Sequence, residues 1–472
     1  MRKTTESSEE SLHRRSYGVH LTSSEIFLKF IFPVIKEKIW EYKWVDLYAG
    51  EGNLILPILD SIPPADRINF FKTHIYLSDI QEEMLEKCIK KAVNYGIPPE
   101  VAMQNIELRD NLEQSPDFLK DDQGSIFHIT NPPYLYLGYI RKHKETQKYL
   151  KLFEGKNNGY QDLYQIAMLN DLRNQLNNLI YIIPTNFLFG SSVSNKFRRD
   201  FLKYYRINKM LIFETKIFEF TGTNICIGFF ERKKIPKSEV IKFEGTKFKK
   251  QNVELRKVYI LKPKYKYRAG SEFDEFLEEN RVDNPLNVNY YLLKKEILNN
   301  KGSNKVSVID ANNYKNSQYN KIDLRVNDNL KAKIESNILY IRTVDTGSIN
   351  GRVGLGIITE DFDVNGIYVS GNTYRTHPIQ IFLDPELSHN DQILLKNYFN
   401  LLLESFRKKL DSEFLTTYKY SNAEYTRKYL GLTQVRNLIQ TFPYKNSNQS
   451  FQEKLSNFVG KKDLEKFLEL LR

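Results

Sequence analysis

The sequence has 472 residues, 41% of them hydrophobic and 27% charged, the composition of a water-soluble protein with room for two or more domains. Its two cysteines, Cys88 and Cys226, exclude a disulfide framework and a cysteine-based metal site, and we expect no metal. No apolar run reaches membrane-spanning length and the N-terminal residues lack a signal-peptide core, so we expect a cytoplasmic protein.

The formal net charge is +12, and it is unevenly distributed. Residues 1–240 hold 33 of the 70 basic residues and 30 of the 58 acidic residues, a net +3, which leaves +9 for residues 241–472. A basic second half suggests a polyanionic partner such as nucleic acid. Composition alone also fits a solvated, lysine-rich surface.

In chain order, the first half alternates short apolar runs with amphipathic segments. We expect strands over residues 43–49, 73–79, 105–110, 125–130, 178–184, 207–214 and 224–232. We expect helices over residues 53–62, 80–96, 159–176 and 193–205. This alternation predicts an α/β fold with a mostly parallel sheet. The last two strands have no helix between them and should end the sheet as an antiparallel pair.

The alternation stops near residue 235, where a basic, strand-like stretch follows. We therefore predict three parts: a flexible N-terminus over 1–16, an α/β domain over 17–240 and an α+β domain over 241–472. Within the last part we expect a strand-rich stretch over 339–383 and helices over 390–410 and 461–472.

The stretch DLYAGEGNL, residues 46–54, predicts a strand end, a tight glycine turn and a helix start. Glycines at such a turn, here Gly50 and Gly52, let the backbone approach a ligand at the carboxyl edge of a parallel sheet. The third glycine of a pyrophosphate-binding turn is replaced by Ile55, which favours a ligand without phosphates.

Acidic residues end the next two predicted strands. Asp79 is placed to accept hydrogen bonds from both hydroxyls of a ribose, and Asp110 from an adenine amino group. Each feature alone also fits an ordinary turn or a helix cap. Together with the glycine turn, in order at three strand ends, they favour an adenosine-containing cofactor.

The tetrapeptide Asn131-Pro132-Pro133-Tyr134 follows the fourth predicted strand. If the cofactor is S-adenosylmethionine, two acceptors aimed at the protons of a base amine would free its lone pair for attack on the methyl group. The Asn131 side-chain carbonyl and the Pro132 backbone carbonyl suit this task, and the prolines fix their geometry. Tyr134 offers a face for stacking the base. A strand stopped by a Pro-Pro turn is the structural alternative.

These motifs resemble the amino-group DNA methyltransferases, specifically the TaqI-like adenine-N6 modification enzymes of the γ arrangement. GVHLTSSEI, residues 18–26, is similar to the family's N-terminal cofactor segment, with Ser23 where proline is usual. The resemblance covers residues 17–234 and implies S-adenosylmethionine as cofactor. The cofactor residues that it implies are Thr22, Asp46, Tyr48, Gly50, Gly52, Asp79, Ile80, Asp110 and Asn131. It also implies that Phe218, or else Phe220, stacks on the other face of a flipped base.

Residues 417–443 resemble the closing part of recognition domains in such enzymes, with basic and aromatic residues interleaved. The expected DNA-binding residues are Lys419, Arg427, Lys428 and Arg436. The expected partner is double-stranded DNA. No nuclease signature stands out, so a cognate restriction endonuclease would be a separate protein.

The expected function is sequence-specific DNA adenine-N6 methylation, as the modification enzyme of a restriction-modification system. Cytosine-N4 methylation is a close alternative, although those enzymes usually carry serine at the position of Asn131. RNA guanine and protein glutamine amides also present a conjugated amine and remain possible substrates. A DNA-binding module on an inactive methyltransferase fold is the non-catalytic alternative.

Overall fold

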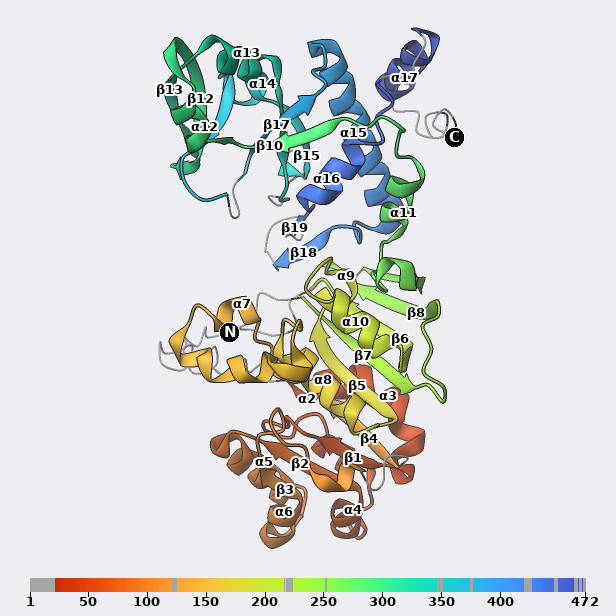
Figure 1. Ribbon diagram of the computed structural model, residues 1–472. Helices are drawn as coiled ribbons and strands as arrows, with labels where there is room; N and C mark the ends of the chain where they lie inside the picture. The colour runs from red at the N-terminus through yellow and green to blue at the C-terminus, as the bar shows by residue number, and fades with distance from the viewer. Residues whose placement is uncertain are drawn as a thin grey trace. The chain divides into compact units, whose positions relative to one another are not determined.

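The computed structural model describes residues 22–120, 125–215, 217, 224–250, 253–345, 348, 351–373, 377–419, 427–444, 449–461, 466 and 469. The predicted flexible segment 1–16 lies outside these residues. The chain forms two compact units, Met1–Ala269 (unit 1) and Gly270–Arg472 (unit 2) (Figure 1). No helix among the described residues is long and apolar enough to cross a membrane.

Unit 1 is built on a nine-stranded sheet in the order β3-β2-β1-β4-β5-β7-β6-β8-β9. Its strands are β1 (Lys43–Asp46), β2 (Ile75–Asp79), β3 (Ile106–Leu108), β4 (Ile126–Thr130), β5 (Asn178–Pro184), β6 (Tyr205–Phe213), β7 (Ile225–Arg232), β8 (Ile241–Phe248) and β9 (Glu254–Leu261). The first five strands are parallel, and β7 runs antiparallel to both β5 and β6. The predicted fold class, a mostly parallel sheet with antiparallel strands, is confirmed.

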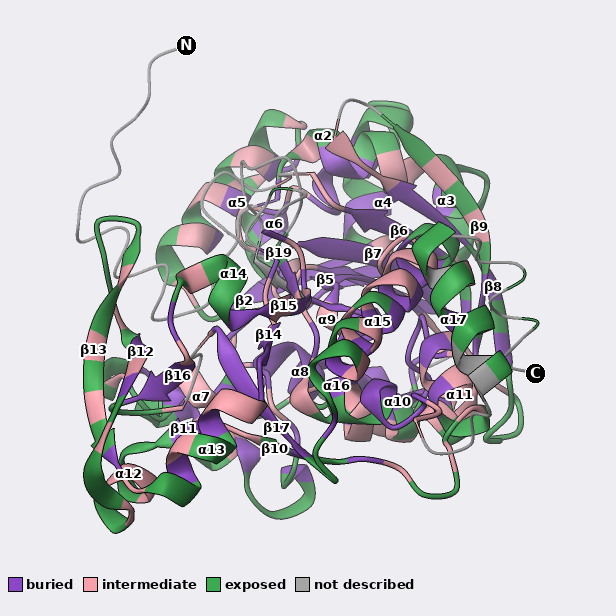
Figure 2. Ribbon diagram, turned by 90° about the horizontal axis from the view of Figure 1, so that it is seen from above, coloured by how far each residue is buried: buried purple, intermediate pink, exposed green. Residues whose placement is uncertain are grey.

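The parallel strands are covered on both faces, which explains their continuous apolar runs. All five residues of β2 are buried, as are the last six of β5 (Figure 2). The longer α-helices of this unit are α4 (Arg67–His74), α5 (Glu82–Asn94), α6 (Pro99–Asn105), α8 (Leu163–Arg173) and α10 (Asn195–Leu202). Shorter α-helices are α2 (Ser24–Ile26), α3 (Phe32–Ile35), α7 (Leu137–Ile140) and α9 (Asn186–Phe189). Helix α5 buries Leu85, Cys88 and Ala92, whose spacing of three and four residues makes one apolar stripe.

The sequence predicted that the sheet would end at the antiparallel pair, but the sheet continues beyond it. Strand β8 pairs parallel to β6, and β9 pairs antiparallel to β8. The boundary between the units therefore lies at Ala269/Gly270 and not at 240/241. The loss of β-α alternation marks the end of the crossovers, but a hairpin can still extend the sheet by edge pairing. The pairing partner of such a hairpin leaves no trace in local sequence pattern.

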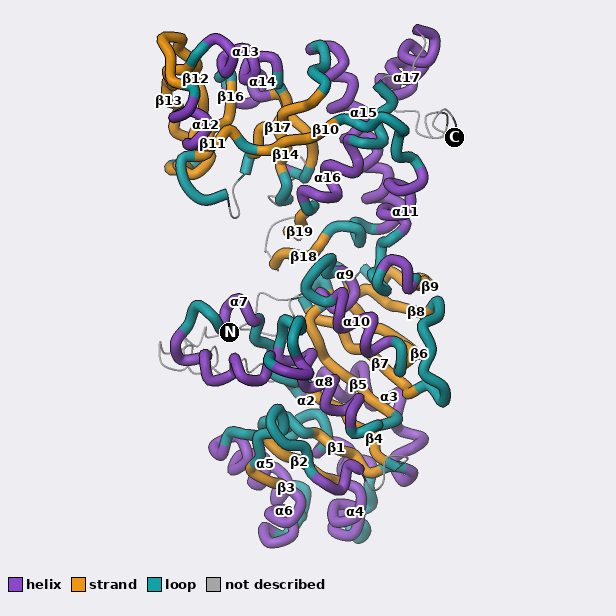
Figure 3. The backbone as a smooth tube through the Cα atoms, viewed as in Figure 1, coloured by secondary structure: helices purple, strands orange, loops and turns teal. Residues whose placement is uncertain are grey.

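Unit 2 is α+β, with two four-stranded sheets in the orders β10-β17-β14-β15 and β11-β16-β12-β13 (Figure 3). Its strands are β10 (Asn287–Tyr290), β11 (Leu292–Leu293), β12 (Lys301–Lys315), β13 (Gln318–Val326), β14 (Leu339–Arg342), β15 (Gly354–Ile357), β16 (Gly366–Val369), β17 (Ile379–Asp384), β18 (Thr416–Lys419) and β19 (Arg427–Tyr429). Its main helices are α11 (Glu272–Glu279), α13 (Asp328–Ser336), α15 (His389–Leu410), α16 (Leu432–Ile439) and α17 (Gln449–Lys461).

Helix α15 organises the larger core of unit 2. It buries Leu395, Tyr398, Phe399, Leu402 and Leu403 in one hydrophobic cluster. The helix predicted at 390–410 and the strand-rich stretch 339–383 are both present. Most of the helix predicted at 461–472 lies outside the described residues, and helices α16 and α17 were not predicted.

Candidate active site

The glycine turn after β1 lies where the chain reverses its direction of travel through the sheet, because β1 pairs with β2 on one side and β4 on the other. Gly50 and Gly52 have φ angles of 52° and 77°, in the left-handed region that favours glycine. A Cβ on Gly52 would lie 2.7 Å from Leu56 Cδ1 and 2.8 Å from Cys88 Sγ. Both glycines are therefore needed for this close turn.

Asp79 ties the ends of the first two strands together. Gly50 N–H donates to its Oδ2 at 2.8 Å, and Gln81 N–H donates to its Oδ1 at 2.9 Å. Burial raises the pKa of Asp79, and these backbone hydrogen bonds oppose the rise. Each carboxylate oxygen keeps a lone pair with which it can accept a further hydrogen bond.

Asp46 at the end of β1 is fully buried. Thr130 Oγ1 donates to Asp46 Oδ1 at 2.6 Å, and Tyr48 N–H donates to the same oxygen at 3.0 Å. Burial raises the pKa of Asp46 to about 6, and the Thr130 hydrogen bond opposes this rise. A cation placed beside Asp46 would therefore stabilise its ionised form.

Asn131, directly after β4, is held by the segment that precedes the first helix. Its Nδ2 donates to Thr22 Oγ1 at 2.9 Å, and Asn53 Nδ2 donates to the Thr22 carbonyl at 2.8 Å. Asn53 thereby joins the glycine turn to this segment. Thr22 thus connects the glycine turn to the tetrapeptide that begins with Asn131.

Tyr134 differs from the prediction in its surroundings. The residue is 8% exposed, and it does not line the cavity described below. Its hydroxyl lies against both Asn131 Oδ1 and the Ile182 carbonyl, the latter at 2.6 Å. A phenol has one hydrogen, so it donates to one of these acceptors at a time. When it bonds Ile182, its hydrogen does not compete with a substrate donor at the Asn131 oxygen.

One cavity unites the strand ends. Most of the predicted cofactor and catalytic residues line it: Thr22, Asp46, Tyr48, Gly50, Asp79, Ile80, Asp110, Asn131, Pro132 and Pro133. Gly52 supports the turn but does not line the cavity, and Phe218 and Phe220 lie outside the described residues. The cavity also contains Glu51 and Arg109, so acidic side chains outnumber basic ones and the site suits a cationic ligand.

Two further residues of the cavity were missed at the level of sequence. Gln81 Oε1 and Asn111 Oδ1 are buried acceptors with no hydrogen-bond partner in the described part of the chain. Asn111 Nδ2 is fixed by the Leu47 carbonyl at 2.6 Å and by Ser78 Oγ at 2.9 Å. Buried acceptors of this kind are normally satisfied, so both are suited to donors of a ligand. Asn111 directly follows Asp110, and Gln81 lies two residues after Asp79, which was the available signal.

The residues predicted to bind DNA lie around β19 of unit 2. Arg427 and Arg436 are exposed, and the Arg436 guanidinium lies 5.5 Å from the centre of the Tyr290 ring. Lys428 is 7% exposed and lies near Asp345, where burial raises the pKa of the carboxyl and the Lys428 charge opposes the rise. Its burial makes Lys428 a poor phosphate contact. Lys419 belongs to β18, which pairs with β19.

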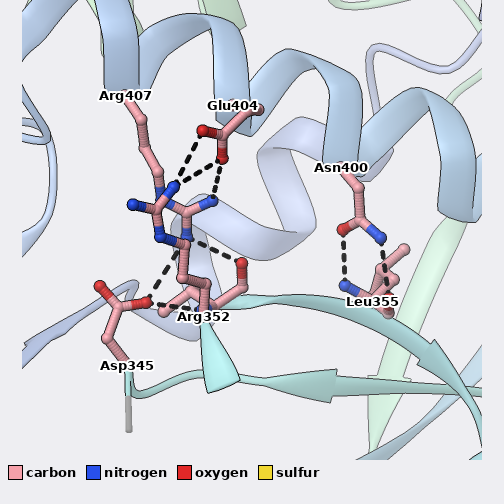
Figure 4. A network of polar contacts seen from close by, with 7 residues as sticks. Asp345, Arg352, Leu355, Asn400, Glu404 and Arg407 are labelled. Atoms are coloured by element: carbon pink, nitrogen blue, oxygen red, sulfur yellow. Dashed lines mark hydrogen bonds and ion pairs between the residues drawn. The ribbon is translucent and has the colours of Figure 1, made fainter. Parts of the chain in front are cut away.

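A buried polar network supports this region (Figure 4). Arg407 on α15 bonds the Val353 carbonyl at 2.9 Å and Glu404 at 3.2 Å, and it lies 3.5 Å from Asp345. Asp345 in turn accepts from Val353 N–H at 2.6 Å, and its own N–H donates to the Lys428 carbonyl at 2.9 Å. Strand β19 is thereby attached to α15 through Asp345.

Comparison with known proteins agrees with the arrangement in unit 1. Residues 16–218 match the family model described as Eco57I restriction-modification methylase. This match supports a methylase of restriction-modification type and coincides with the region of the family resemblance. A comparison with curated proteins found no match.

Several solved structures are similar to this chain at low sequence identity, and one of them has a TM-score above 0.5. The type IIL restriction-modification enzyme MmeI, solved in complex with DNA, is 12% identical with a TM-score of 0.55, over 97% of this chain and 72% of that one. The type IIG restriction endonuclease BpuSI is 12% identical with a TM-score of 0.43, over 96% and 62%. A modification subunit of a putative type I enzyme from Vibrio vulnificus YJ016 is 16% identical with a TM-score of 0.37, over 60% of each chain. The chain thus spans less than two thirds of the last two proteins.

Proposed function

We propose that this protein is an S-adenosylmethionine-dependent DNA adenine-N6 methyltransferase, the modification enzyme of a restriction-modification system. The observation that carries the proposal is one cavity lined by Asp46, Asp79, Asp110 and Asn131 at four successive strand ends. The match of residues 16–218 to the restriction-modification methylases supports the same reaction class.

The cavity fits the proposed cofactor in charge and in hydrogen bonding. S-adenosylmethionine carries its methyl group on a sulfonium. After the methyl group is transferred, the sulfur remains as a neutral thioether, so its departure requires no general acid. Asp46 would face its cationic part, Asp79 its ribose hydroxyls and Asp110 its adenine amine. The unpartnered oxygens of Gln81 and Asn111 give two further acceptors for its donor groups.

The substrate amine would lie against the Asn131 side-chain oxygen and the Pro132 carbonyl. Two acceptors on its protons favour a tetrahedral nitrogen with a free lone pair, and Asn131 and Pro132 supply them on a fixed backbone. Thr22 and Tyr134 hold the Asn131 amide from its two ends. This gives Tyr134 a positioning role, while stacking of the base on its ring stays a prediction. Asn131 in place of serine favours adenine over cytosine.

The DNA would be recognised through unit 2, where exposed basic side chains suit contacts with phosphates. Arg427 and Arg436 are its exposed candidates among the predicted phosphate contacts. Most of the basic excess of residues 241–472 lies in residues 241–269 of unit 1, which hold 10 basic and 2 acidic residues. A restriction endonuclease acting on the same sequence would be encoded separately.

The test is methyl transfer from labelled S-adenosylmethionine into mixed-sequence duplex DNA, followed by nucleoside analysis. Wild-type protein should produce N6-methyladenine. Asn131→Ala should lower the rate at least about a hundredfold, the scale expected when one positioned hydrogen-bonding group is removed, and leave cofactor affinity nearly intact. Label in RNA, in protein or in N4-methylcytosine would replace the proposal with one of the alternatives.

A further inference from the structure

Strands β12 and β13 form a long hairpin whose end extends beyond the core of unit 2. Near its base, Val306, Val308 and Val326 are fully buried in a cluster with α13. Beyond Asp310, the side chains are mostly exposed (Figure 2). The turn residues Asn316 and Ser317 both have positive φ, at 50° and 63°, as in a tight two-residue hairpin turn.

The hairpin end is rigidly supported despite its exposure. The Tyr319 hydroxyl donates to the His377 carbonyl at 2.9 Å, and its ring lies 4.6 Å from that of Tyr314. Asn312 accepts from Gly371 N–H at 2.8 Å and donates to the Asn372 carbonyl at 3.0 Å. A segment that binds a ligand specifically must hold its side chains in fixed positions, and these hydrogen bonds and the ring contact provide such support.

The chemistry of this end fits a nucleic acid. Residues 311–322 contain no acidic residue, two lysines and five amide side chains. Lys321 is paired with Asp363 at 3.2 Å, while Lys315 is exposed and forms no ion pair with the described residues. Exposed amides suit base edges, where Asn or Gln can bond adenine with two hydrogen bonds, and a free lysine suits a phosphate.

From these observations we propose that the β12–β13 hairpin enters a groove of duplex DNA, with Gln318 facing base edges and Lys315 a backbone phosphate. A two-stranded ribbon has dimensions that the major groove admits. The proposal rests on the proposed function for the identity of the DNA partner. It assigns part of the sequence selectivity to a segment outside the basic and aromatic stretch 417–443.

The experiment uses the full-length protein and two readouts. Methylated adenines are mapped on a random-sequence duplex library, and affinity for a fluorescent mixed-sequence duplex is measured against salt. Gln318→Ala should relax the methylated motif at one or two positions and weaken discrimination there about tenfold. Lys315→Ala should keep the motif, weaken binding to all sequences and lower the slope of log affinity against log salt by about one.

Lys408→Ala, which removes an exposed lysine from α15, is the matched control and should change neither readout. Thermal unfolding of each variant confirms that the chain remains folded. An unchanged motif, affinity and salt slope in both hairpin variants would overturn the proposal, as would an effect on RNA or protein binding without one on duplex DNA. If wild-type protein binds duplex DNA through Lys315 yet methylates nothing, the proposed function fails and the hairpin assignment stands.

Discussion

At the scale of single residues, the candidate site is a set of carboxylates whose oxygens already accept hydrogen bonds from the protein. Asp79 accepts from Gly50 and Gln81, so it shapes the turn and also presents oxygens to a ligand. Asp46 likewise accepts hydrogen bonds from the Thr130 hydroxyl and the Tyr48 N–H. The ligand therefore adds to hydrogen-bond networks that already exist, which limits the reorganisation needed on binding.

Asp79→Asn should weaken S-adenosylmethionine binding by about tenfold or more, because hydrogen bonds to a charged acceptor contribute about 1.5–3 kcal/mol. Titration calorimetry measures the dissociation constant. Asp117→Asn is the control, since that side chain is 82% exposed and forms its ion pair with nearby Lys120. Equal affinity of the Asp79 variant and wild type would contradict a ribose role for Asp79.

The raised pKa of Asp46 predicts a pH dependence of cofactor binding. Below about pH 6 the carboxyl is protonated and no longer attracts a cationic group, so affinity should fall as pH drops through 6. The decrease should approach about tenfold per pH unit. Since the pKa in the folded protein exceeds 3.8, ionisation of Asp46 also lowers fold stability as pH rises from 3.8 to about 6, an effect that a bound cation opposes. Calorimetry on both sides of pH 6 tests this, and Asp46→Asn should bind weakly without that dependence.

At the scale of elements, β19 is linked to a buried ion-pair network on α15 through the Asp345 N–H, which donates to the Lys428 carbonyl. Arg407 is 8% exposed and Asp345 is 5% exposed. Burial lowers the pKa of Arg407 and raises the pKa of Asp345. Removing one partner of such a pair leaves a buried charge, at a cost of about 3–5 kcal/mol. The network therefore matters for the integrity of unit 2 more than the surface ion pairs do.

Arg407→Met should accordingly lower the unfolding temperature of the protein and weaken duplex DNA binding, with cofactor affinity unchanged. Differential scanning calorimetry and fluorescence anisotropy give the two quantities. Lys408→Ala, on the exposed side of the same helix, should change stability by about 0.5 kcal/mol or less. An Arg407→Met protein as stable as wild type would show that the network does not hold β19.

At the scale of the whole molecule, the strand series and the cofactor edge were predictable because parallel strands carry strong local patterns. Asp46, Asp79 and Asn131 could be placed together because carboxyl ends of parallel strands meet at one sheet edge. Extension of the sheet by β8 and β9 could not be predicted, since edge pairing depends on a partner distant in the sequence. Gln81 and Asn111 were missed because an unsatisfied buried oxygen is visible only in three dimensions.

The stacking role of Phe218 and the DNA contact of Lys419 stay predictions. The burial of Lys428 also shows a limit of sequence patterns in unit 2: a lysine in a basic, aromatic stretch can face inward when an acidic side chain such as Asp345 receives it. Exposure, and with it DNA contact, is decided by the tertiary structure.

The most direct test of the central claim is to express the chain in a bacterial host that lacks adenine methylation and to map modified bases across its genome. Wild-type protein should place N6-methyladenine in one recurring sequence, and Asn131→Ala, expressed to the same level, should place none. Genomes without N6-methyladenine, or with methyl groups on cytosine N4 instead, would contradict the account.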